Sequence, residues 1–169
     1  VSQVAALTAA QVVVLTADQV QALTTTSVAA LTTAQVAALK TTQIAALSTA
    51  SVAALLSTQL AALSLAQVGA LSTDQVVALK ASQVAVLTAP QIAALTTEQV
   101  QALGSATVAA LTTAQVAAIA SDDLATMETA DIAALSTAVI AKLSTGQLSA
   151  LSTAQVANLT TKQMAVVTT

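Results

Sequence analysis

The chain has no aromatic residue, no histidine, no cysteine and no arginine, and only 3 glycines and 1 proline in 169 residues. Without cysteine there is no disulfide and no thiol chemistry. Without histidine or cysteine, most transition-metal sites and most activated nucleophiles are excluded. Without aromatic side chains, a core has to be thin and filled by Leu, Val, Ile and Ala. We therefore expect no enzymatic activity, no catalytic, cofactor-binding or metal-binding residues, and no cofactor.

Charge and long apolar runs are also scarce. Charged residues make up 7% of the chain, the net charge is −3, and only four residues are cationic. Such a chain lacks the basic footprint that binds phosphate backbones, so we expect no nucleic-acid partner. Apolar residues make up 56%, but their runs end after about five residues, as in Val52–Leu56, whereas a spanning helix needs about 20. The sequence predicts no membrane insertion and a polar surface of Thr, Ser and Gln.

What the chain does contain is one octapeptide, repeated about 21 times. Every eighth residue from Leu7 to Val167 is large and apolar, and the unit reads Leu-Thr/Ser-Thr-x-Gln-Val-Ala-Ala. A strict short period indicates a repeat architecture, in which each unit buries its apolar face only against its neighbours. We expect residues 1–169 to form a single continuous array. Because the octad is cut at both ends, we also expect this sequence to be an excerpt of a longer array.

Two regular conformations are incompatible with this period. A continuous α-helix turns about 100° per residue, so each octad would shift the leucine row by about 80° and form no stable stripe. In a β-strand, residues five apart point to opposite faces, which would separate Leu31 from Val36. The Ala and Leu content also disfavours strands.

One short capped helix per octad satisfies the pattern. In the unit Leu31–Leu39, Thr32 as N-cap and Gln35 as the third helical residue (N3) form a capping box. Leu31 and Val36 then occupy the two positions of a hydrophobic staple. Gln holds N3 in fifteen of twenty-one units, and the next position (N4) is always aliphatic or Met. The sequence predicts an all-α solenoid of helices of about seven residues, with three or four octads per superhelical turn.

The charged residues support these helix starts independently. All seven acidic residues lie between N-cap and N3, where the positive end of the helix dipole favours them: Asp18, Asp74, Glu98, Asp122, Asp123, Glu128 and Asp131. Pro90 lies at N2, where its missing N–H costs nothing. We expect Thr112→Ala combined with Gln115→Ala to lower stability by about 1–2 kcal/mol through lost capping.

Three features resemble binding or modification sites, each with a structural alternative. The acidic residues Asp122, Asp123, Glu128 and Asp131 offer carboxylate oxygens for calcium but lack a Gly-containing ligand loop, and helix starts explain them all. Asn158-Leu159-Thr160 matches the N-glycosylation pattern near an expected helix end. Paired hydroxyls such as Thr32-Thr33 and Thr112-Thr113 recur at fixed spacing, and capping requires only the first of each pair.

Two resemblances follow from these units. The segments Leu71–Leu79 and Leu111–Ser121 resemble the first helix of transcription activator-like effector repeats. The second helix, the base-reading loop, the longer period and the basic charge of those repeats are missing, so DNA binding does not carry over. End to end, units such as Leu31–Leu39, Leu111–Ile119 and 128–135 resemble the Leu-Thr-Thr-Ala-Gln-Val-Ala-Ala-Leu arrays of very long bacterial surface or adhesin-like proteins. This resemblance implies export to the cell surface or medium and a stalk or fibre role.

We therefore expect a structural repeat segment, a stalk, spacer or fibre of a large extracellular bacterial protein, with no catalytic activity. The alternative is a binding module whose ordered Thr array, in an Ala-rich chain without aromatics, resembles ice-binding proteins and recognises ice or another regular surface. The expected partners are neighbouring repeats of the same array, with end-to-end or lateral self-association.

Overall fold

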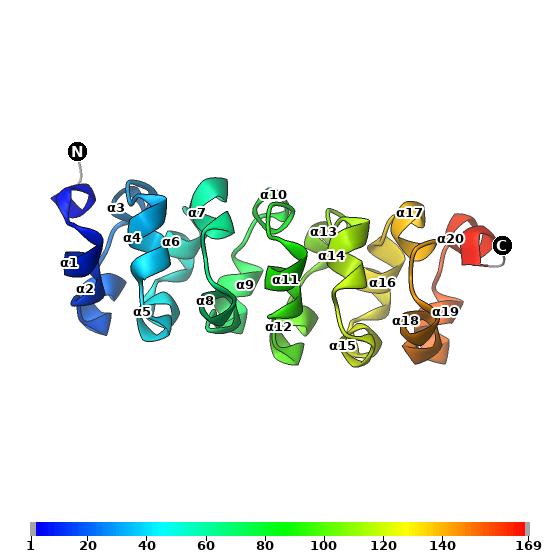
Figure 1. Ribbon diagram of the computed structural model, residues 1–169. Coiled ribbons are helices and arrows are strands. Elements are labelled where there is room, and N and C mark those ends of the chain that lie inside the picture. Colours follow the sequence, from blue (N-terminus) through cyan, green and yellow to red (C-terminus); the bar gives the residue numbers. More distant parts are fainter. Residues whose placement is uncertain (1–2, 168–169) are drawn as a thin grey trace.

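The computed structural model describes residues 3–167, in which short helices coil about one long axis (Figure 1). The described part contains one 3-10 helix and twenty α-helices and no strand. Their bounds are η1 (Gln3–Ala6), α1 (Ala9–Val13), α2 (Ala17–Gln21), α3 (Thr25–Ala29), α4 (Thr33–Ala38), α5 (Thr41–Ala46), α6 (Thr49–Ala53), α7 (Ser57–Ala61), α8 (Leu65–Gly69), α9 (Thr73–Val77), α10 (Ala81–Val84), α11 (Ala89–Ala93), α12 (Thr97–Gln101), α13 (Ser105–Val108), α14 (Thr113–Ala117), α15 (Ser121–Thr126), α16 (Thr129–Ala134), α17 (Thr137–Ile140), α18 (Thr145–Ala150), α19 (Thr153–Ala157) and α20 (Thr161–Val167). The predicted all-α solenoid, one helix per octad, is confirmed.

Each helix begins at the predicted residue. In α4, the Thr32 hydroxyl accepts from the Gln35 backbone N–H at 3.2 Å, and the Gln35 side-chain oxygen accepts from the Thr32 backbone N–H at 2.6 Å. The complete box recurs at Thr8, Thr16, Thr32, Ser64, Ser72, Thr88, Thr96, Thr112, Ser144, Ser152 and Thr160. Together the two bonds satisfy two backbone donors that have no partner inside the helix.

The α-helices other than α20 are shorter than the predicted seven residues, and most contain five or six. The octad ends in a tighter turn, in which the leucine N–H bonds the residue three before it, as from Leu39 to Val36 at 3.2 Å. Leu39 (φ −58°, ψ 139°) and Lys40 (φ −70°, ψ 156°) are then both extended. These two consecutive extended residues end one helix and change the direction of the chain before the next helix begins.

Successive turns stack so that each helix packs against the third one along the chain. α1 contacts α4, α2 contacts α5, and this relation continues to α17 and α20. Hydrogen bonds between turns join residues 26 to 31 apart, such as Gln75 with Leu47 (28) and Ile44 (31). Since the packed helices are three octads apart and these bonds reach almost four, one superhelical turn takes between three and four octads, as predicted.

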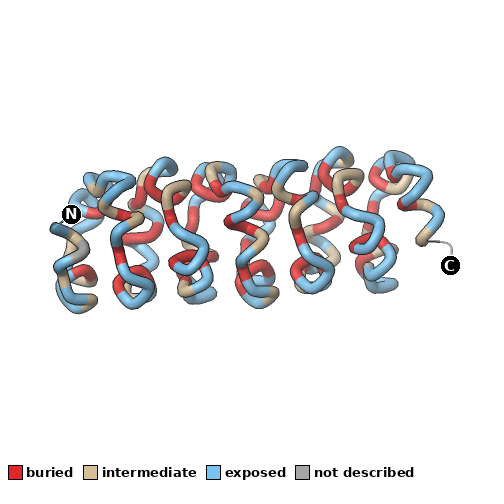
Figure 2. The backbone as a smooth tube through the Cα atoms, turned by 90° about the horizontal axis from the view of Figure 1, so that it is seen from above, coloured by how far each residue is buried: buried red, intermediate tan, exposed pale blue. Residues whose placement is uncertain are grey.

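The core is a continuous seam of aliphatic side chains inside the coil. Most N4 residues and most of the leucines that flank the helices are buried, as with Val36 at 0% and Leu39 at 4% exposure, and they belong to one hydrophobic cluster. Figure 2 shows the buried positions recurring in every coil, with exposed segments between them. This shared core holds together helices that are too short to be stable alone.

Acidic residues and the proline lie where the sequence places them. Asp18, Asp74, Glu98, Asp122 and Asp123 are in the first turns of their helices. Asp131 is in the first turn of α16, Glu128 is its N-cap, and Pro90 is in the first turn of α11. No helix among residues 3–167 is long and apolar enough to span a bilayer.

Candidate functional site

The most specific arrangement in the molecule is a ladder of buried glutamines between turns. Residues 3–167 form no ligand-sized pocket and bring together no group of three or more acidic residues that could hold a metal ion. Glutamine, in contrast, occupies N3 in fifteen of the twenty-one octads, and twelve of these glutamines use both ends of their amide. We call these twelve the glutamine ladder.

Gln75 of α9 illustrates one rung. Its side-chain oxygen accepts from the Ser72 backbone N–H at 2.8 Å, which completes the capping box. Its side-chain Nε2 donates to the carbonyls of Ile44 at 3.0 Å and Leu47 at 2.6 Å, on the preceding turn. The residue is 1% exposed. An amide has two N–H donors and one carbonyl, so all its strong hydrogen-bonding groups are used.

The other rungs repeat this geometry. In each rung, the glutamine Nε2 donates to the backbone carbonyl of the residue 28 positions earlier, which occupies the leucine position of its octad. In most rungs Nε2 also donates to the carbonyl of the N4 residue 31 positions earlier. Ladder glutamines that reach the preceding turn are Gln35, Gln43, Gln59, Gln67, Gln75, Gln83, Gln91, Gln99, Gln115, Gln147, Gln155 and Gln163. All twelve are at most 5% exposed. Each rung therefore caps its own helix and satisfies C-terminal carbonyls of a helix one turn away.

This second role explains why the position is Gln and never Glu. A glutamate oxygen completes a capping box as well as a glutamine oxygen. A carboxylate has no donor, however, and would face two carbonyl oxygens in a buried site. Sequence reasoning assigned the glutamines to capping alone and missed the link between turns. The absence of Glu from all twenty-one N3 positions is the signal that could have revealed it.

Where N3 is not glutamine, the link changes or disappears. Asp123 accepts from the Thr97 hydroxyl at 2.7 Å, and Asp131 from the Ser105 hydroxyl at 2.6 Å, each 26 residues earlier. The direction of the bond is thus reversed: the earlier turn donates. Ser51 donates to the Leu23 carbonyl at 3.2 Å. The side chain of Val139 has no hydrogen-bond donor, so it makes no link to the preceding turn.

The N-caps tolerate more variation. At Lys40, Leu56 and Lys80 no side-chain acceptor caps the helix, yet the N-cap N–H still bonds the N3 glutamine oxygen at 2.7–2.8 Å. Gly104, Ala120 and Glu128 also make no side-chain cap bond. Where N3 is glutamine, the single bond from the N-cap N–H to the glutamine oxygen is therefore sufficient at the start of a helix.

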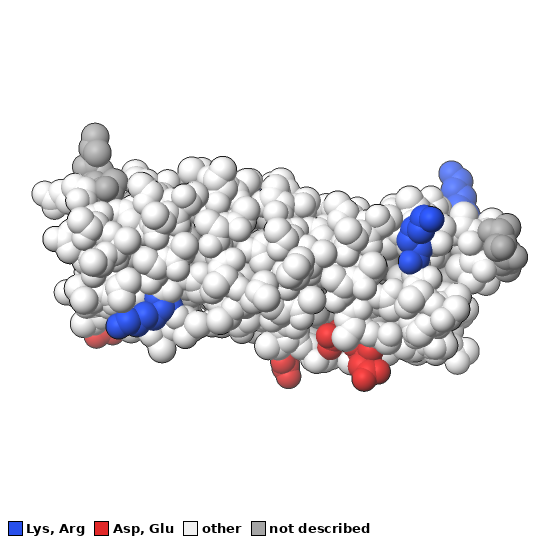
Figure 3. All heavy atoms as spheres, viewed as in Figure 1, with Lys and Arg blue, Asp and Glu red and all other residues white. Residues whose placement is uncertain are grey.

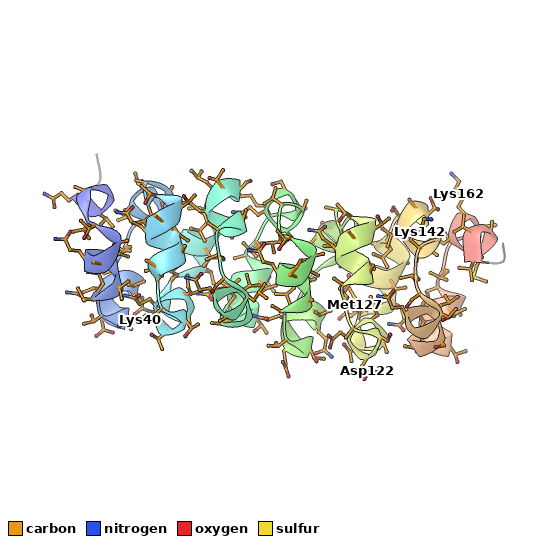
Figure 4. All side chains as sticks on the ribbon, viewed as in Figure 1. Lys40, Asp122, Met127, Lys142 and Lys162 are labelled. Atoms are coloured by element: carbon orange, nitrogen blue, oxygen red, sulfur yellow. The ribbon has the colours of Figure 1, made fainter. Side chains whose placement is uncertain are left out.

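The four acidic residues considered for calcium have separate environments. Asp123 and Asp131 accept hydroxyl bonds from different residues of the preceding turn, while Asp122 and Glu128 are exposed at helix starts. Figure 3 shows most of the visible surface free of charge, with acidic atoms along its lower edge. In Figure 4, Asp122 lies at this edge and Lys142 and Lys162 lie at the upper one.

One carboxylate has a shifted pKa. The hydrogen bond from the backbone N–H of Glu98 itself, followed by the bond from the Thr96 hydroxyl, lowers the pKa of Glu98 from its ordinary value. Both groups belong to the first turn of α12, so the shift expresses the preference of a helix start for negative charge. The lowered pKa therefore reflects the position of Glu98 at a helix start and does not identify it as a reactive group.

The hydroxyl pairs and Asn158 occupy surface positions. Second-position residues such as Thr33 and Thr113 are exposed. Where second-position hydroxyls reach the next turn, at Thr97 and Ser105, they bond an N3 carboxylate 26 residues later and not another second-position hydroxyl. Asn158 is the exposed C-cap of α19, and its side chain donates to the Ala154 carbonyl at 2.8 Å.

Comparison with known families decides the class of repeat. The ALTTAQ repeat matches the chain at residues 21–49, 28–65, 49–81, 65–97, 73–105, 92–127 and 124–161. The chain belongs to the ALTTAQ repeat family. The family's six letters correspond to residues 30–35, which run from the end of one helix through the cap to the ladder glutamine. No curated protein and no solved structure matches the chain.

Proposed function

We propose that this ALTTAQ array is a structural spacer, a segment of a stalk or fibre in a large bacterial surface or secreted protein, and that it catalyses no reaction. The observation that carries the proposal is the uniform linkage of turns in series by buried glutamines. Each rung fixes one turn on the next, so the distance between two points depends on the number of octads between them. A surface almost without charge limits nonspecific binding.

The proposed spacer is stiff and compact. Stacked helices lie about 8–10 Å apart, so one turn of three to four octads adds about 9 Å, or about 0.3 Å per residue. A single α-helix rises 1.5 Å per residue. The array therefore reaches less far per residue than a lone helix but has many links across its width. Such a design suits a load-bearing segment that must hold its length.

The length relation is testable with two probes. Thr33 and Thr145 are exposed and lie 112 residues, or 14 octads, apart, which is about four turns. Because the chain has no cysteine, Thr33→Cys with Thr145→Cys gives two unique labelling sites. We expect a narrow distance distribution centred at about 32–40 Å plus the label linkers, unchanged by salt. A broad or salt-dependent distribution would contradict a spacer role.

The export part of the proposal rests on the resemblance to surface-protein arrays and has a separate test. Protease treatment of intact cells of the source bacterium should remove the array from the cell fraction while cytoplasmic markers remain. Full protection of the array inside intact cells would contradict surface display and leave the spacer role standing.

Recognition of ice or another regular surface is the weaker alternative. It requires second-position hydroxyls to align on one flat face, whereas those that contact the next turn, Thr97 and Ser105, meet an N3 carboxylate there and not another second-position hydroxyl. Ice recrystallisation in the presence of the chain distinguishes the two. The spacer proposal predicts no inhibition, whereas inhibition that is lost when second-position Thr residues become Val would favour the alternative.

A further inference from the structure

The links between turns are unevenly distributed along the solenoid. Six consecutive ladder glutamines, from Gln59 to Gln99, tie α7–α12 to the preceding turn, and most of them bond two carbonyls there. In the next five helices, α13–α17, the only glutamine at N3 is Gln115. We call α4–α12 the regular stretch and α13–α17, residues 105–140, the irregular stretch.

The other four N3 residues of the irregular stretch make no amide rung. Asp123 and Asp131 each accept one bond from a hydroxyl of the earlier turn, at 2.7 and 2.6 Å. The bond to Asp123 lies at the surface, where water competes for both groups. Thr107 and Val139 have no side-chain amide. The irregular stretch is therefore held to its neighbouring turns mainly by the apolar core, which continues through it.

Tension along the axis loads the interfaces between turns in series. Successive turns follow one another along the long axis of the molecule (Figure 1), and each rung crosses from one turn to the preceding one. A pull on two points along this axis therefore acts on every interface between them with the same force. Because each repeat contacts only its neighbours, one interface can open while the others stay closed. The interface with the fewest links opens first.

We propose that axial tension extends the irregular stretch before the regular one, so that the array releases length at a force which the regular stretch withstands. The inference rests on the proposed spacer role, since only a segment that carries load would use it. A folded turn rises about 0.3 Å per residue and an extended chain about 3.3–3.6 Å, so opening residues 105–140 adds about 100 Å. When the load falls, the turns that remain folded on either side provide the surfaces on which this stretch refolds.

Stretching single molecules of the full chain with optical tweezers tests this order of opening. Handles attached at Thr33→Cys and Thr145→Cys, both exposed positions, place the two stretches under the same load. We expect a first, reversible step of about 100 Å at a lower force than the later steps. Moving the second handle from Thr145 to the exposed Glu98, as Glu98→Cys, takes the irregular stretch out of the load path. The low-force step should then disappear.

Adding amides to the irregular stretch should delay its opening. Thr107→Gln with Val139→Gln places an amide 28 residues after Leu79 and Leu111, the separation at which the ladder rungs form. At constant force, the first step should then occur about 10-fold or more slowly. The matched control, Thr107→Met with Val139→Met, adds side chains of similar length without donors and should open as fast as the wild type does.

The converse change keeps the proposal testable if the added glutamines disturb folding. Gln83→Met with Gln91→Met removes two rungs from the regular stretch. With handles at Thr33 and Glu98, this variant should show a low-force step that the parent chain lacks. Circular dichroism of each variant confirms folding before it is stretched.

Three results would each overturn the proposal: a first step of the same length and force with the handle at Glu98, a single step that extends both stretches together, or opening that is insensitive to the glutamine changes. Failure of the spacer role would appear differently, as a broad distribution of distances between Thr33 and Thr145 in the absence of load.

Discussion

Two stretches of the solenoid reach the same architecture with different side chains. In α4–α12, eight of the nine N3 residues are glutamine, with Ser51 the exception. In α13–α17, N3 is Thr107, Gln115, Asp123, Asp131 and Val139 in turn. Both stretches place each helix on the third one along and bury their N4 residues, with Val108 and Ile132 at 0% exposure. The aliphatic spacing therefore sets the superhelix, and the polar links reinforce it.

The two stretches differ in how neighbouring turns are tied. In the regular stretch the later turn donates through an amide; at Asp123 and Asp131 it accepts from hydroxyls of the earlier turn. Three of the five helices of the irregular stretch lack a side-chain cap, at Gly104, Ala120 and Glu128, against three of the nine in the regular stretch, at Lys40, Leu56 and Lys80. We infer that residues 105–140 open more easily than the regular stretch, which regional amide hydrogen exchange would reveal.

Replacing one ladder glutamine by glutamate, which exchanges a hydrogen-bond donor for an acceptor, should lower stability the most. Gln75→Glu places a carboxylate against the carbonyls of Ile44 and Leu47, and we expect it to destabilise the fold by about 3–5 kcal/mol at neutral pH. Asp131→Asn, in contrast, keeps the oxygen that accepts from Ser105 and should cost less than about 1 kcal/mol. Urea unfolding measures both. If the two variants lost the same free energy of unfolding, the regular and irregular stretches would not differ in how their turns are linked.

Separating the two roles of a rung gives the next largest effect. Thr112→Ala removes only a cap acceptor and should cost about 1 kcal/mol. Gln115→Ala also removes the bonds to Val84 and Leu87 of the preceding turn, so we expect a loss of about 2–3 kcal/mol. The pair should then exceed the 1–2 kcal/mol that capping alone predicts. If denaturant unfolding gives Gln115→Ala the same cost as Thr112→Ala, the link between turns contributes nothing to stability.

Installing a missing rung should make the irregular stretch resemble the regular one. Val139→Gln positions an amide for the carbonyls of Val108 and Leu111, 31 and 28 residues earlier. We expect a gain of about 0.5–1 kcal/mol, since new hydrogen bonds offset the loss of a buried valine. Val139→Met, of similar length but without donors, is the control. A glutamine variant no more stable than the methionine variant would show that the rung geometry is absent there.

The smallest expected effect concerns pH. The pKa of Glu98 is lowered in the folded chain, so its contribution to stability is present above the pKa of the unfolded chain and is lost as the pH falls through the folded pKa. Carbon-13 NMR titration should give Glu98 a pKa below the ordinary value. In Thr96→Val, which removes the second contributor, that pKa should rise toward it. An unshifted pKa in the wild type would contradict the helix-start account.

The sequence predicts most of what happens inside an octad and little of what happens between turns. Thr32, Gln35, Leu31 and Val36 have cap and staple roles because the chemistry of a helix start is local. The helix length was overestimated because the second extended residue, Leu39, is a consequence of the turn between octads. A strict eight-residue period contains no information about which octads stack, so the 28-residue offset and the buried carbonyl partners of Gln75 required the structure.

The central claim is that each superhelical turn takes three to four octads and is joined to the next by glutamine rungs, and distances between exposed labels test it most directly. Thr33 is paired in turn with Thr49, Ser57 and Thr73, which lie 16, 24 and 40 residues later and are all exposed. Double electron–electron resonance on the three cysteine pairs gives the three distances. The structure predicts the shortest for Thr33 with Ser57, because α4 packs against α7. A shorter distance to Thr49 or to Thr73 would place other octads side by side and contradict the glutamine ladder.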